Sequence, residues 1–431
     1  MTKQMNVPNI RFAEYVDAWE TTPLSDLVVS VDSGWSPQCD EGSAAGSEWG
    51  VLKTTSVQWT GFEPDKNKKL PKALEPRNSL SLKQGDILVT RAGPNERVGV
   101  VSLVDKDYPN LMLSDKIIRL RTKPEINPSY LTLNLCLKKS NYQIMRKASG
   151  LATSQTNISQ KFLLQTKLSI PTFPEQQKIA SFLSKVDEKI ALLTEKKDKL
   201  TEYKKGVMQQ LFNGEWEEQD GQLTFTPPTL RFKADDGSEF PDWEEKKLGQ
   251  VFTRIRRKNK ENNQNVLTIS AQKGLINQEK YFNKSVAAKD VTGYYLLENG
   301  DFAYNKSYSK GYPMGAIKRL NNYDKGVVST LYICFGLNKG FVSDFFEHYF
   351  ESGLQNRDLS KIAQEGARNH GLLNISVDEF FKDVKLLTPS HDEQLKIANF
   401  LSAIDQKIDL ANSELEKAKE WKKGLLQQMF V

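Results

Sequence analysis

The sequence predicts an α+β protein in which two mixed α/β domains alternate with two long helices that pair as a coiled coil. Three observations support this prediction. The chain has 431 residues, 38% of them hydrophobic. A chain of that length usually folds into more than one domain. One long helical segment occurs twice, and short β-branched and aromatic runs fill the region before each copy. The expected divisions are a first domain at 1–170, a helix at 171–213, a second domain at 214–388 and a helix at 389–431.

The repeated segment is the strongest signal in the chain. Residues 171–212 align without a gap with residues 389–430 at an offset of 218, and 21 of the 42 aligned positions are identical. Identity of that density over that length indicates a tandem duplication, and each copy of the duplicated unit ends in this segment.

Local signals predict that each copy is a continuous helix. Thr172 with Glu175, and Ser390 with Glu393, have the S/T-x-x-E spacing of a capping box. Apolar residues then recur at alternating spacings of four and three, the heptad pattern of a helical seam. Such a helix is a rod of about 57 Å, so two of them paired would form a spacer. The residues expected to pair are Ile179, Leu183, Val186, Ile190, Ile397, Leu401, Ile404 and Ile408.

The alternative to helix pairing is that each helix packs onto its own domain, as many long amphipathic helices do. Lys197, Lys204 and Lys422 interrupt the seam. Identities between the two copies also continue beyond the seam, which suggests a duplicated surface for a duplicated partner. The polar residues expected to bind that partner are Glu175, Gln176, Gln209, Gln210, Glu393, Gln394, Gln427 and Gln428.

The two domain regions share an outline but little sequence. Each opens with Arg-Phe followed by Trp-Glu, at Arg11 and Trp19 in the first and at Arg231 and Trp243 in the second. A Gly-Asp pair recurs at 85–86 and 300–301. Strands are expected at 86–90, 98–104, 116–120, 327–335 and 384–387, and helices at 128–145 and 342–355. Each domain is then a mixed α+β unit with a strand-rich core.

The motifs of catalytic and metal sites were sought and are missing from the sequence. Three cysteines and three histidines are scattered through the chain, so no local spacing supports a metal site. No Gly-rich nucleotide loop or ATP-binding motif occurs. Asn127-Pro128 resembles part of an amino-methyltransferase loop, but helix capping explains it better. We therefore expect no catalytic centre, no metal and no cofactor on this chain.

No apolar run is long enough to cross a membrane, and the first residues lack the apolar core of a secretory signal. We therefore expect a cytoplasmic protein with no membrane partner.

The charge pattern is compatible with nucleic-acid binding, although any one basic run can also be an ordinary solvated surface. The formal net charge is +6 and the pI is near 8.8, which is compatible with a polyanionic partner without requiring one. Basic side chains alternate with polar and aromatic ones in both domains, and such groups contact phosphates and base edges. Arg91 and Lys306 are the preferred candidates, because both domains keep a cation at this matched position. The expected DNA-binding residues are Lys53, Lys66, Lys68, Lys69, Arg91, Arg97, Gln155, Arg254, Arg256, Arg257, Lys258, Lys306, Lys310, Arg368 and Asn369.

These features together resemble the DNA-specificity subunits of type I restriction-modification systems. The most specific marks are Pro-x-x-x-Glu-Gln-x-x-Ile-Ala-x-Phe-Leu at 171–183 and 389–401, and the Lys-Lys-Gly-x-x-Gln-Gln ending of each copy. The likeness covers essentially the whole chain, as two target-recognition domains alternating with two repeated helices.

The resemblance implies that each domain reads one half of a bipartite target in double-stranded DNA, and that the helices pair antiparallel and set the gap. It implies two modification subunits that methylate adenine, and ATP-dependent restriction subunits that cleave. S-adenosylmethionine, ATP and Mg²⁺ would then act on those partners only, and this chain would be non-catalytic. Two alternatives stay open: a coiled-coil scaffold that binds proteins without recognising DNA, and a self-sufficient enzyme.

Overall fold

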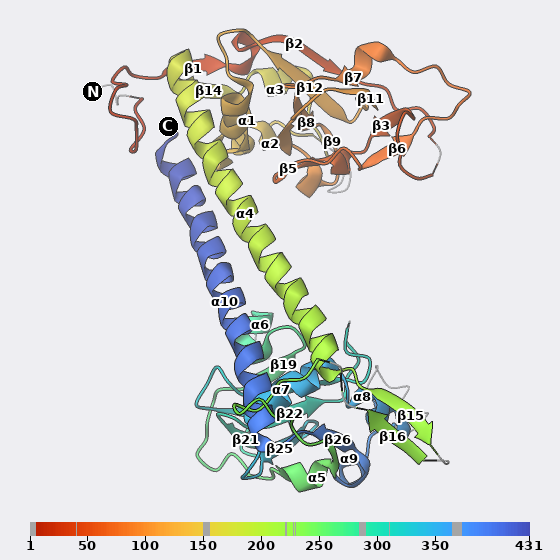
Figure 1. Ribbon diagram of the computed structural model, residues 1–431. Coiled ribbons are helices and arrows are strands. Elements are labelled where there is room, and N and C mark those ends of the chain that lie inside the picture. Colours follow the sequence, from red (N-terminus) through yellow and green to blue (C-terminus); the bar gives the residue numbers. More distant parts are fainter. Residues whose placement is uncertain are drawn as a thin grey trace. The chain divides into compact units, whose positions relative to one another are not determined.

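The computed structural model describes residues 6–39, 41–149, 156–219, 222–226, 228, 230–283, 290–309, 311–363 and 373–431. Two compact units divide the chain: unit 1 comprises 1–193 and 414–431, and unit 2 comprises 194–413. The division passes through both long helices, α4 (Phe173–Phe212) and α10 (His391–Gln428) (Figure 1). Each unit therefore contains the first part of one long helix and the last part of the other.

Unit 1 is built on a four-stranded antiparallel sheet in the order β10-β8-β12-β2. Its two inner strands are β8 and β12, and β8 is buried throughout. Ile87 and Val89 enter one core cluster while Leu88 enters another, because successive side chains of a strand point to opposite faces. The elements are β1 (Glu20–Pro23), β2 (Val28–Ser33), β3 (Gly50–Leu52), β4 (Val57–Gln58), β5 (Gly61–Phe62), β6 (Asn67–Lys69), β7 (Ser81–Leu82), β8 (Ile87–Thr90), β9 (Ala92–Gly93), β10 (Val101–Leu103), β11 (Tyr108–Met112), β12 (Ile117–Thr122), α1 (Pro128–Cys136), α2 (Lys138–Met145), β13 (Thr156–Asn157), α3 (Gln160–Leu164) and β14 (Lys167–Ile170).

Unit 2 contains the same sheet, in the order β23-β22-β25-β18. Taken along the chain, β18, β22, β23 and β25 hold the places that β2, β8, β10 and β12 hold in unit 1. The pair that precedes each long helix is also repeated, as β1 with β14 and β17 with β26. The elements are β15 (Glu215–Gln219), β16 (Gln222–Thr226), β17 (Glu244–Lys247), α5 (Leu248–Val251), β18 (Phe252–Arg254), β19 (Leu267–Ser270), β20 (Gly274–Asn277), α6 (Gln278–Phe282), β21 (Tyr295–Glu298), β22 (Phe302–Asn305), β23 (Ala316–Arg319), β24 (Lys325–Val328), β25 (Ile333–Leu337), α7 (Ser343–Ser352), α8 (Asn356–Ile362), α9 (Val377–Asp383) and β26 (Lys385–Thr388).

The units differ outside this shared sheet. Unit 1 adds a second four-stranded sheet, β6-β3-β11-β7, whereas unit 2 adds the strand pairs β19–β20 and β21–β24. Two sequence expectations also need correction. The helix expected at 128–145 is two helices, because Leu137 has an extended backbone with ψ of 144°. The strand expected at 327–335 is two strands, separated by a turn in which the amide of Tyr332 donates to the carbonyl of Ser329 (3.1 Å).

The repeated Gly-Asp pair forms the turn that leads into the inner strand of each sheet. Gly85 and Gly300 have φ of +87° and +92°, which glycine adopts without a steric penalty. Asp86 then accepts from the amide of Lys83 (3.0 Å), and Asp301 accepts from the amide of Glu298 (2.8 Å). The motif is thus a structural turn that starts β8 and β22 at matched positions.

The first turn of each long helix is attached to its unit by a buried ion pair. Glu175 is 1% exposed and pairs with Arg11 (2.7 Å), while Glu393 is fully buried and pairs with Arg231 (2.7 Å). Hydrogen bonds to these carboxylates raise the pKa of both guanidinium groups. The capping-box expectation is therefore only partly met. Ser390 Oγ accepts from the amide of Glu393 (3.4 Å), but the glutamate side chain itself turns to the arginine.

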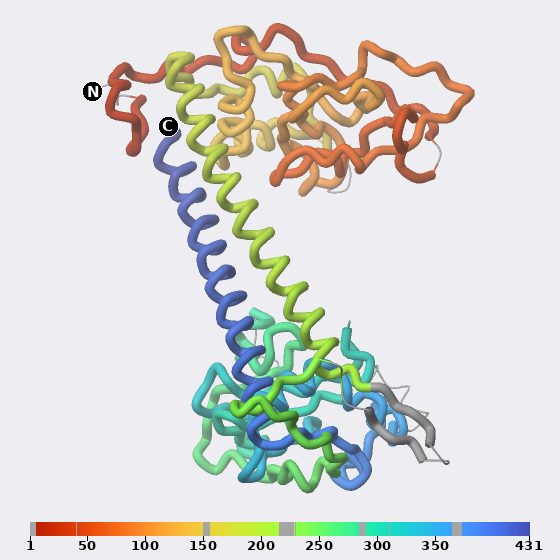
Figure 2. The backbone as a smooth tube through the Cα atoms, in the orientation of Figure 1, coloured from red at the N-terminus to blue at the C-terminus, as the bar shows by residue number. Residues whose placement is uncertain are grey.

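The last turn of each long helix packs in the unit that holds the start of the other. In unit 1 the Phe430 ring stacks on Tyr130 with centroids 5.4 Å apart and meets Trp19 edge-on at 6.2 Å. In unit 2 the Phe212 ring meets Trp243 edge-on at 6.3 Å. Figure 2 shows the C-terminal end of the chain beside the first part of α4 within unit 1. The two helices therefore run in opposite directions where they meet in each unit.

Reciprocal ion pairs explain two of the lysines that interrupt the seam. Lys204 on α4 reaches both carboxylate oxygens of Asp405 on α10 in unit 2 (2.6 and 2.7 Å). Lys422 on α10 pairs with Asp187 on α4 in unit 1. The two pairs occupy equivalent positions at the offset of 218. A lysine in each copy thus faces an aspartate of the other copy instead of an apolar side chain.

The seam residues are buried where each helix begins. Ile179, Leu183 and Val186 are at most 4% exposed and join the core cluster of unit 1 that also holds Leu425 and Met429 of α10. Their equivalents Ile397, Leu401 and Ile404 join the core of unit 2 together with Met208 and Leu211 of α4. Ile190 and Ile408 are half-buried beside the same clusters. Each helix start thus packs on its own domain and on the end of the other helix at once.

Loss of the buried ion pair should destabilise unit 2. Arg231→Ala leaves the carboxylate of Glu393 buried without its partner, and we expect it to cost about 3 kcal/mol of unfolding free energy in urea denaturation. The matched control is Lys233→Ala, whose pair with Glu239 is 62% and 65% exposed, and we expect no measurable change in stability there. Equal losses in the two variants would show that burial of Glu393 does not matter.

His348 makes the stability of unit 2 depend on pH. Its side chain is 6% exposed and lies 3.9 Å from Asp405, and burial, with the charge of Lys204, lowers its pKa to about 4. The folded state then keeps His348 neutral while the unfolded state takes up a proton near pH 6.5. Stability that is complete above pH 6.5 is therefore lost as the pH falls toward 4.

Thermal unfolding of the wild type and of His348→Gln at pH 7.5 and 5.0 measures this effect. We expect the melting temperature of the wild type to fall further than that of the variant, because the variant has no imidazole to protonate. Parallel decreases in both proteins would contradict a contribution from His348.

Candidate nucleic-acid interface

Four of the cations that we expected to bind DNA lie on β6 and on neighbouring loops of unit 1. The amide of Lys53 donates to the carbonyl of Lys66 (3.0 Å), which joins the segments before β4 and β6. Lys68 is exposed on β6. Arg91 directly follows the inner strand β8 and is half-buried. Among the described residues, none of these four side chains has a carboxylate within 4.0 Å, so their charge is available to an external anion.

Two further cations of unit 1 are already engaged by the protein. Lys69 pairs with Glu48 (2.5 Å). Arg97 donates to the side chain of Gln58 (2.9 Å) and to the carbonyls of Thr54 (2.7 Å) and Val57 (2.8 Å). These bonds occupy both terminal nitrogens of its guanidinium, so Arg97 anchors the segment that leads into the β4–β5 turn. A DNA contact by Arg97 stays a prediction.

The basic run 254–258 of unit 2 also contains both cations that contact other groups of the protein and cations that are accessible. Arg257 pairs with Asp301 (2.8 Å) and Glu298 (3.1 Å), and the ammonium of Lys258 lies 4.3 Å from the ring centroid of Tyr295. Local neighbours therefore compete for both of these charges. Arg254 ends the edge strand β18 and is half-buried, whereas Arg256 is exposed. Arg256 is thus the more accessible cation of the run.

The structure places Arg91 and Lys306 equivalently. Each follows the inner strand of its sheet, β8 or β22. The carbonyl of Arg91 accepts from the amide of Ile158 (2.8 Å), and the carbonyl of Lys306 accepts from the amide of Leu373 (2.9 Å). Both side chains are half-buried. Their sequence match therefore reflects equivalent positions in the sheet that both units share. Gln155, Lys310, Arg368 and Asn369 were also expected to bind DNA and lie outside the described residues.

Four of the eight residues expected to bind a partner need a different explanation. Glu175, Gln176, Glu393 and Gln394 are at most 2% exposed. The two glutamates pair with the arginines described above. Gln176 accepts from the amide of Asn127 (2.9 Å) and donates to the carbonyl of Pro171 (3.0 Å). Gln394 does the same with Val342 (3.0 Å) and Pro389 (2.8 Å). Their identity in the two copies thus preserves a buried junction.

The other four, Gln209, Gln210, Gln427 and Gln428, are exposed and remain predictions. Sequence reasoning missed a second set on the same helices. Leu192 and Leu410 are 66% and 59% exposed, and Tyr203 and Trp421 are 53% and 48% exposed. These are two matched pairs at the offset of 218. Comparing the copies for exposed apolar residues, and not only for polar identities, would have found them.

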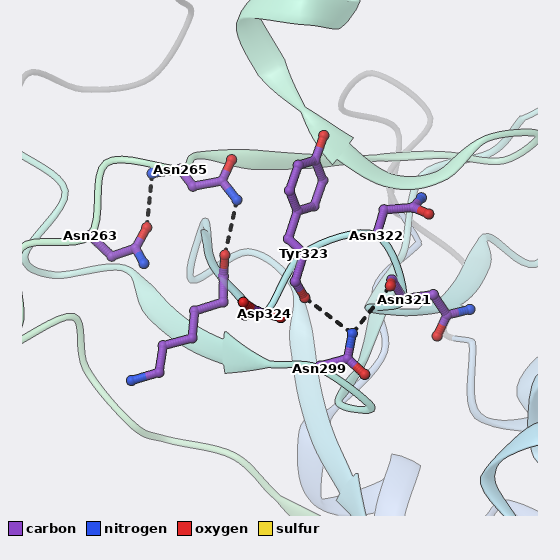
Figure 3. Close-up of a pocket in the computed structure, with 8 residues that line it drawn as sticks. Asn263, Asn265, Asn299, Asn321, Asn322, Tyr323 and Asp324 are labelled. Atoms are coloured by element: carbon purple, nitrogen blue, oxygen red, sulfur yellow. Dashed lines mark hydrogen bonds between the residues drawn. The ribbon is translucent and has the colours of Figure 1, made fainter.

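A polar cavity in unit 2 has a volume of about 610 Å³. Figure 3 shows Asn263, Asn265, Asn299 and Asn321 around it, with Tyr323. Their amides are largely used within the loops: Asn299 donates to the carbonyls of Asn321 and Tyr323 (3.2 Å each), and Asn265 donates to that of Lys325 (2.9 Å). These asparagines therefore hold the loops together.

Few side chains of the described residues are candidates for chemical reactivity. Asn127 caps α1 through its side-chain oxygen, which accepts from the amide of Tyr130 (3.0 Å), so the capping explanation of Asn127-Pro128 is confirmed. Burial raises the pKa of the Cys136 and Cys334 thiols to about 12. Within the described part of the chain, His, Cys, Asp and Glu form no group able to hold a metal ion, and no helix is long and apolar enough to cross a membrane.

Comparisons with known proteins agree with the pattern of the repeat. Residues 19–202 match the family model of the type I restriction modification DNA specificity domain. The EcoEI specificity subunit of Escherichia coli is 41% identical over 165 residues, which are 38% of this chain and 28% of that protein. The putative MjaX specificity subunit of Methanocaldococcus jannaschii is 25% identical over an alignment of 464 residues, covering 100% of this chain and 96% of that protein.

Solved structures extend the likeness to the fold of the chain. The S subunit of a type I restriction-modification system from M. genitalium matches with a TM-score of 0.58 and 18% identity over 99% of both chains. A chain from a structure of type I complex assembly matches with a TM-score of 0.51 and 13% identity, over 96% of this chain and 97% of that one. The family model thus matches residues 19–202, and the resemblance of this chain to type I specificity subunits is confirmed.

Proposed function

We propose that this chain is the sequence-specific DNA-binding subunit of a type I restriction-modification complex. The observation that carries the proposal is the duplicated sheet, which places a cation after the inner strand of two otherwise different domains. A copied frame with diverged loops suits a protein that reads two unlike half-sites. We therefore expect an asymmetric, bipartite target, with one half-site read by each unit.

The antiparallel contacts of α4 and α10 support the remainder of the arrangement. A coiled coil of these helices would set the gap between the half-sites. The buried junction at each helix start would fix the direction in which a domain leaves that coiled coil. Because both junctions use the same residue types at equivalent positions, each domain would be attached to its helix in the same way.

We further propose that two modification subunits dock on the long helices and methylate adenine, and that ATP-dependent restriction subunits join them. The matched exposed pairs Leu192 with Leu410 and Tyr203 with Trp421 support two copies of one partner, because a duplicated surface presents the same apolar contacts twice. S-adenosylmethionine, ATP and Mg²⁺ then belong to those partners, and this chain contributes recognition without catalysis.

Adenine methylation mapped across a genome tests the proposed function. The chain is co-expressed with its cognate modification subunit in an unmethylated host, and N6-methyladenine is located by long-read sequencing. We expect one split motif with unlike halves and a constant gap. No new methylation by an assembled complex would refute DNA recognition and favour a protein-binding scaffold, and identical half-sites would contradict reading by two diverged domains.

Loss of a matched cation should weaken DNA binding. Arg91→Ala or Lys306→Ala should cost about 1–3 kcal/mol if the side chain contacts a base, or lower the salt slope of binding by about one if it contacts a phosphate. Binding isotherms at several salt concentrations measure both quantities. The control is Lys199→Ala on α4, which removes one charge from a surface pair with Glu195. Unchanged affinity and slope would remove these positions from the interface.

A charge placed on the exposed apolar pairs should impair assembly. We expect Leu192→Asp with Leu410→Asp to weaken binding of the modification subunit at least tenfold, because two apolar contacts are replaced by carboxylates. Analytical ultracentrifugation of the co-purified complex measures this. The control is Val29→Asp, on a strand residue that is 62% exposed. Normal assembly of the double variant would place the partner elsewhere.

A further inference from the structure

One aromatic side chain of unit 1 lies where the packing of the unit does not explain it. Trp59 occupies the two-residue turn of the hairpin formed by β4 and β5, whose register pairs Val57 with Phe62 and Gln58 with Gly61. It is 49% exposed. Tight hairpin turns favour Gly, Asn and Asp, so the turn itself does not require tryptophan.

The indole ring of Trp59 has no aromatic, cationic or hydrogen-bonding partner in the described part of the chain. Other tryptophans of unit 1 differ. Trp421 is 48% exposed, but it meets Phe182 edge-on with centroids 6.0 Å apart, and the guanidinium of Arg77 lies 4.0 Å from the ring centroid of Trp35. A large apolar ring left half in water gains free energy when a ligand covers it.

The hairpin holds this ring in a defined place. Val57 is fully buried, and the ring of Phe62 meets Tyr108 edge-on at 5.4 Å. The three hydrogen bonds from Arg97 join the turn to the loop that begins at Arg91. Because both strands and the side chain before the turn are anchored, little conformational freedom would be lost when the ring binds a ligand.

The surroundings of the turn favour a polyanion. The four available cations of unit 1, which are Lys53, Lys66, Lys68 and Arg91, lie on β6 and on the loops beside the hairpin. Glu63, Asp65 and Glu96 of the same region carry the opposite charge, but three carboxylates do not balance four cations. Cations that follow a nucleic-acid backbone, together with an aromatic ring that stacks on bases, are the usual combination in nucleic-acid binding surfaces.

We propose that Trp59 contacts the bases of the half-site read by unit 1, by stacking on them or inserting between them. This inference rests on the proposed function, because it assigns one recognition contact within it. A ring that inserts between base pairs selects steps that unstack easily. Trp59 is then a specificity-determining residue, and Arg97 positions it.

The test compares DNA binding and genome-wide methylation by the complex carrying wild-type chain, Trp59→Ala or Trp59→Phe. We expect Trp59→Ala to weaken binding about 5- to 150-fold, the loss of one stacking contact, with an unchanged salt slope and relaxed sequence preference in one half-site only. Trp59→Phe keeps an aromatic face and should bind within about threefold of wild type on the same grounds. The control is Tyr142→Ala, which removes an aromatic side chain of α2 that is 64% exposed.

The outcomes separate this inference from the proposed function. Normal DNA binding and an unchanged methylation motif with Trp59→Ala would overturn the inference while the function stands, and so would a defect confined to assembly, since it would mark Trp59 as a protein contact. Equal effects of Trp59→Ala and Tyr142→Ala would overturn it as well. Failure of the wild-type complex to bind or methylate DNA would instead refute the proposed function.

Discussion

The buried ion pair at the start of each long helix is the interaction on which the arrangement of each unit depends. Arg11 and Arg231 come from the opening segment of a unit, and Glu175 and Glu393 come from the first turn of a helix. A carboxylate there also benefits from the positive end of the helix dipole. Because a buried carboxylate without its cation is costly, the pair restricts the helix to one position on its domain. Gln176 and Gln394 reinforce this position through bonds to the residue after β14 or β26 and to the residue before α1 or α7.

The long helices link the two copies of the duplication through reciprocal contacts. Phe430 closes the core at the start of α4, and Phe212 closes the core at the start of α10. Lys422 and Lys204 each find an aspartate of the other copy. Neither repeat is therefore complete without the end of the other, which explains why similarity between the copies is highest in the helices. The loops around each sheet are free of this constraint and have diverged.

Residues that maintain the fold of each unit differ from residues that remain available for recognition. The Gly-Asp turns, Arg97 and Arg257 are engaged within their domains, and so are the glutamate and glutamine at each helix start. Arg91 and Lys306 follow strands that both units share, and Trp59 lies in the β4–β5 turn. The core clusters contain none of these three residues. A contact of this kind can change between relatives without loss of the fold. That property is what a family of proteins with different target sequences needs.

The sequence by itself determined the duplication, the two long helices to within a few residues, the α+β class and the family resemblance. Periodicity and similarity between the two copies can be recognised in the sequence without knowing the structure. Only the tertiary structure decided which identities are buried, because Glu175 and Gln209 look alike in an alignment although one lies in a core and the other in water. It also decided which cations are already paired, since Asp301 is 44 residues from Arg257. Only the structure shows that the Trp59 ring has no aromatic, cationic or hydrogen-bonding partner among the described residues, because such partners come from distant parts of the chain.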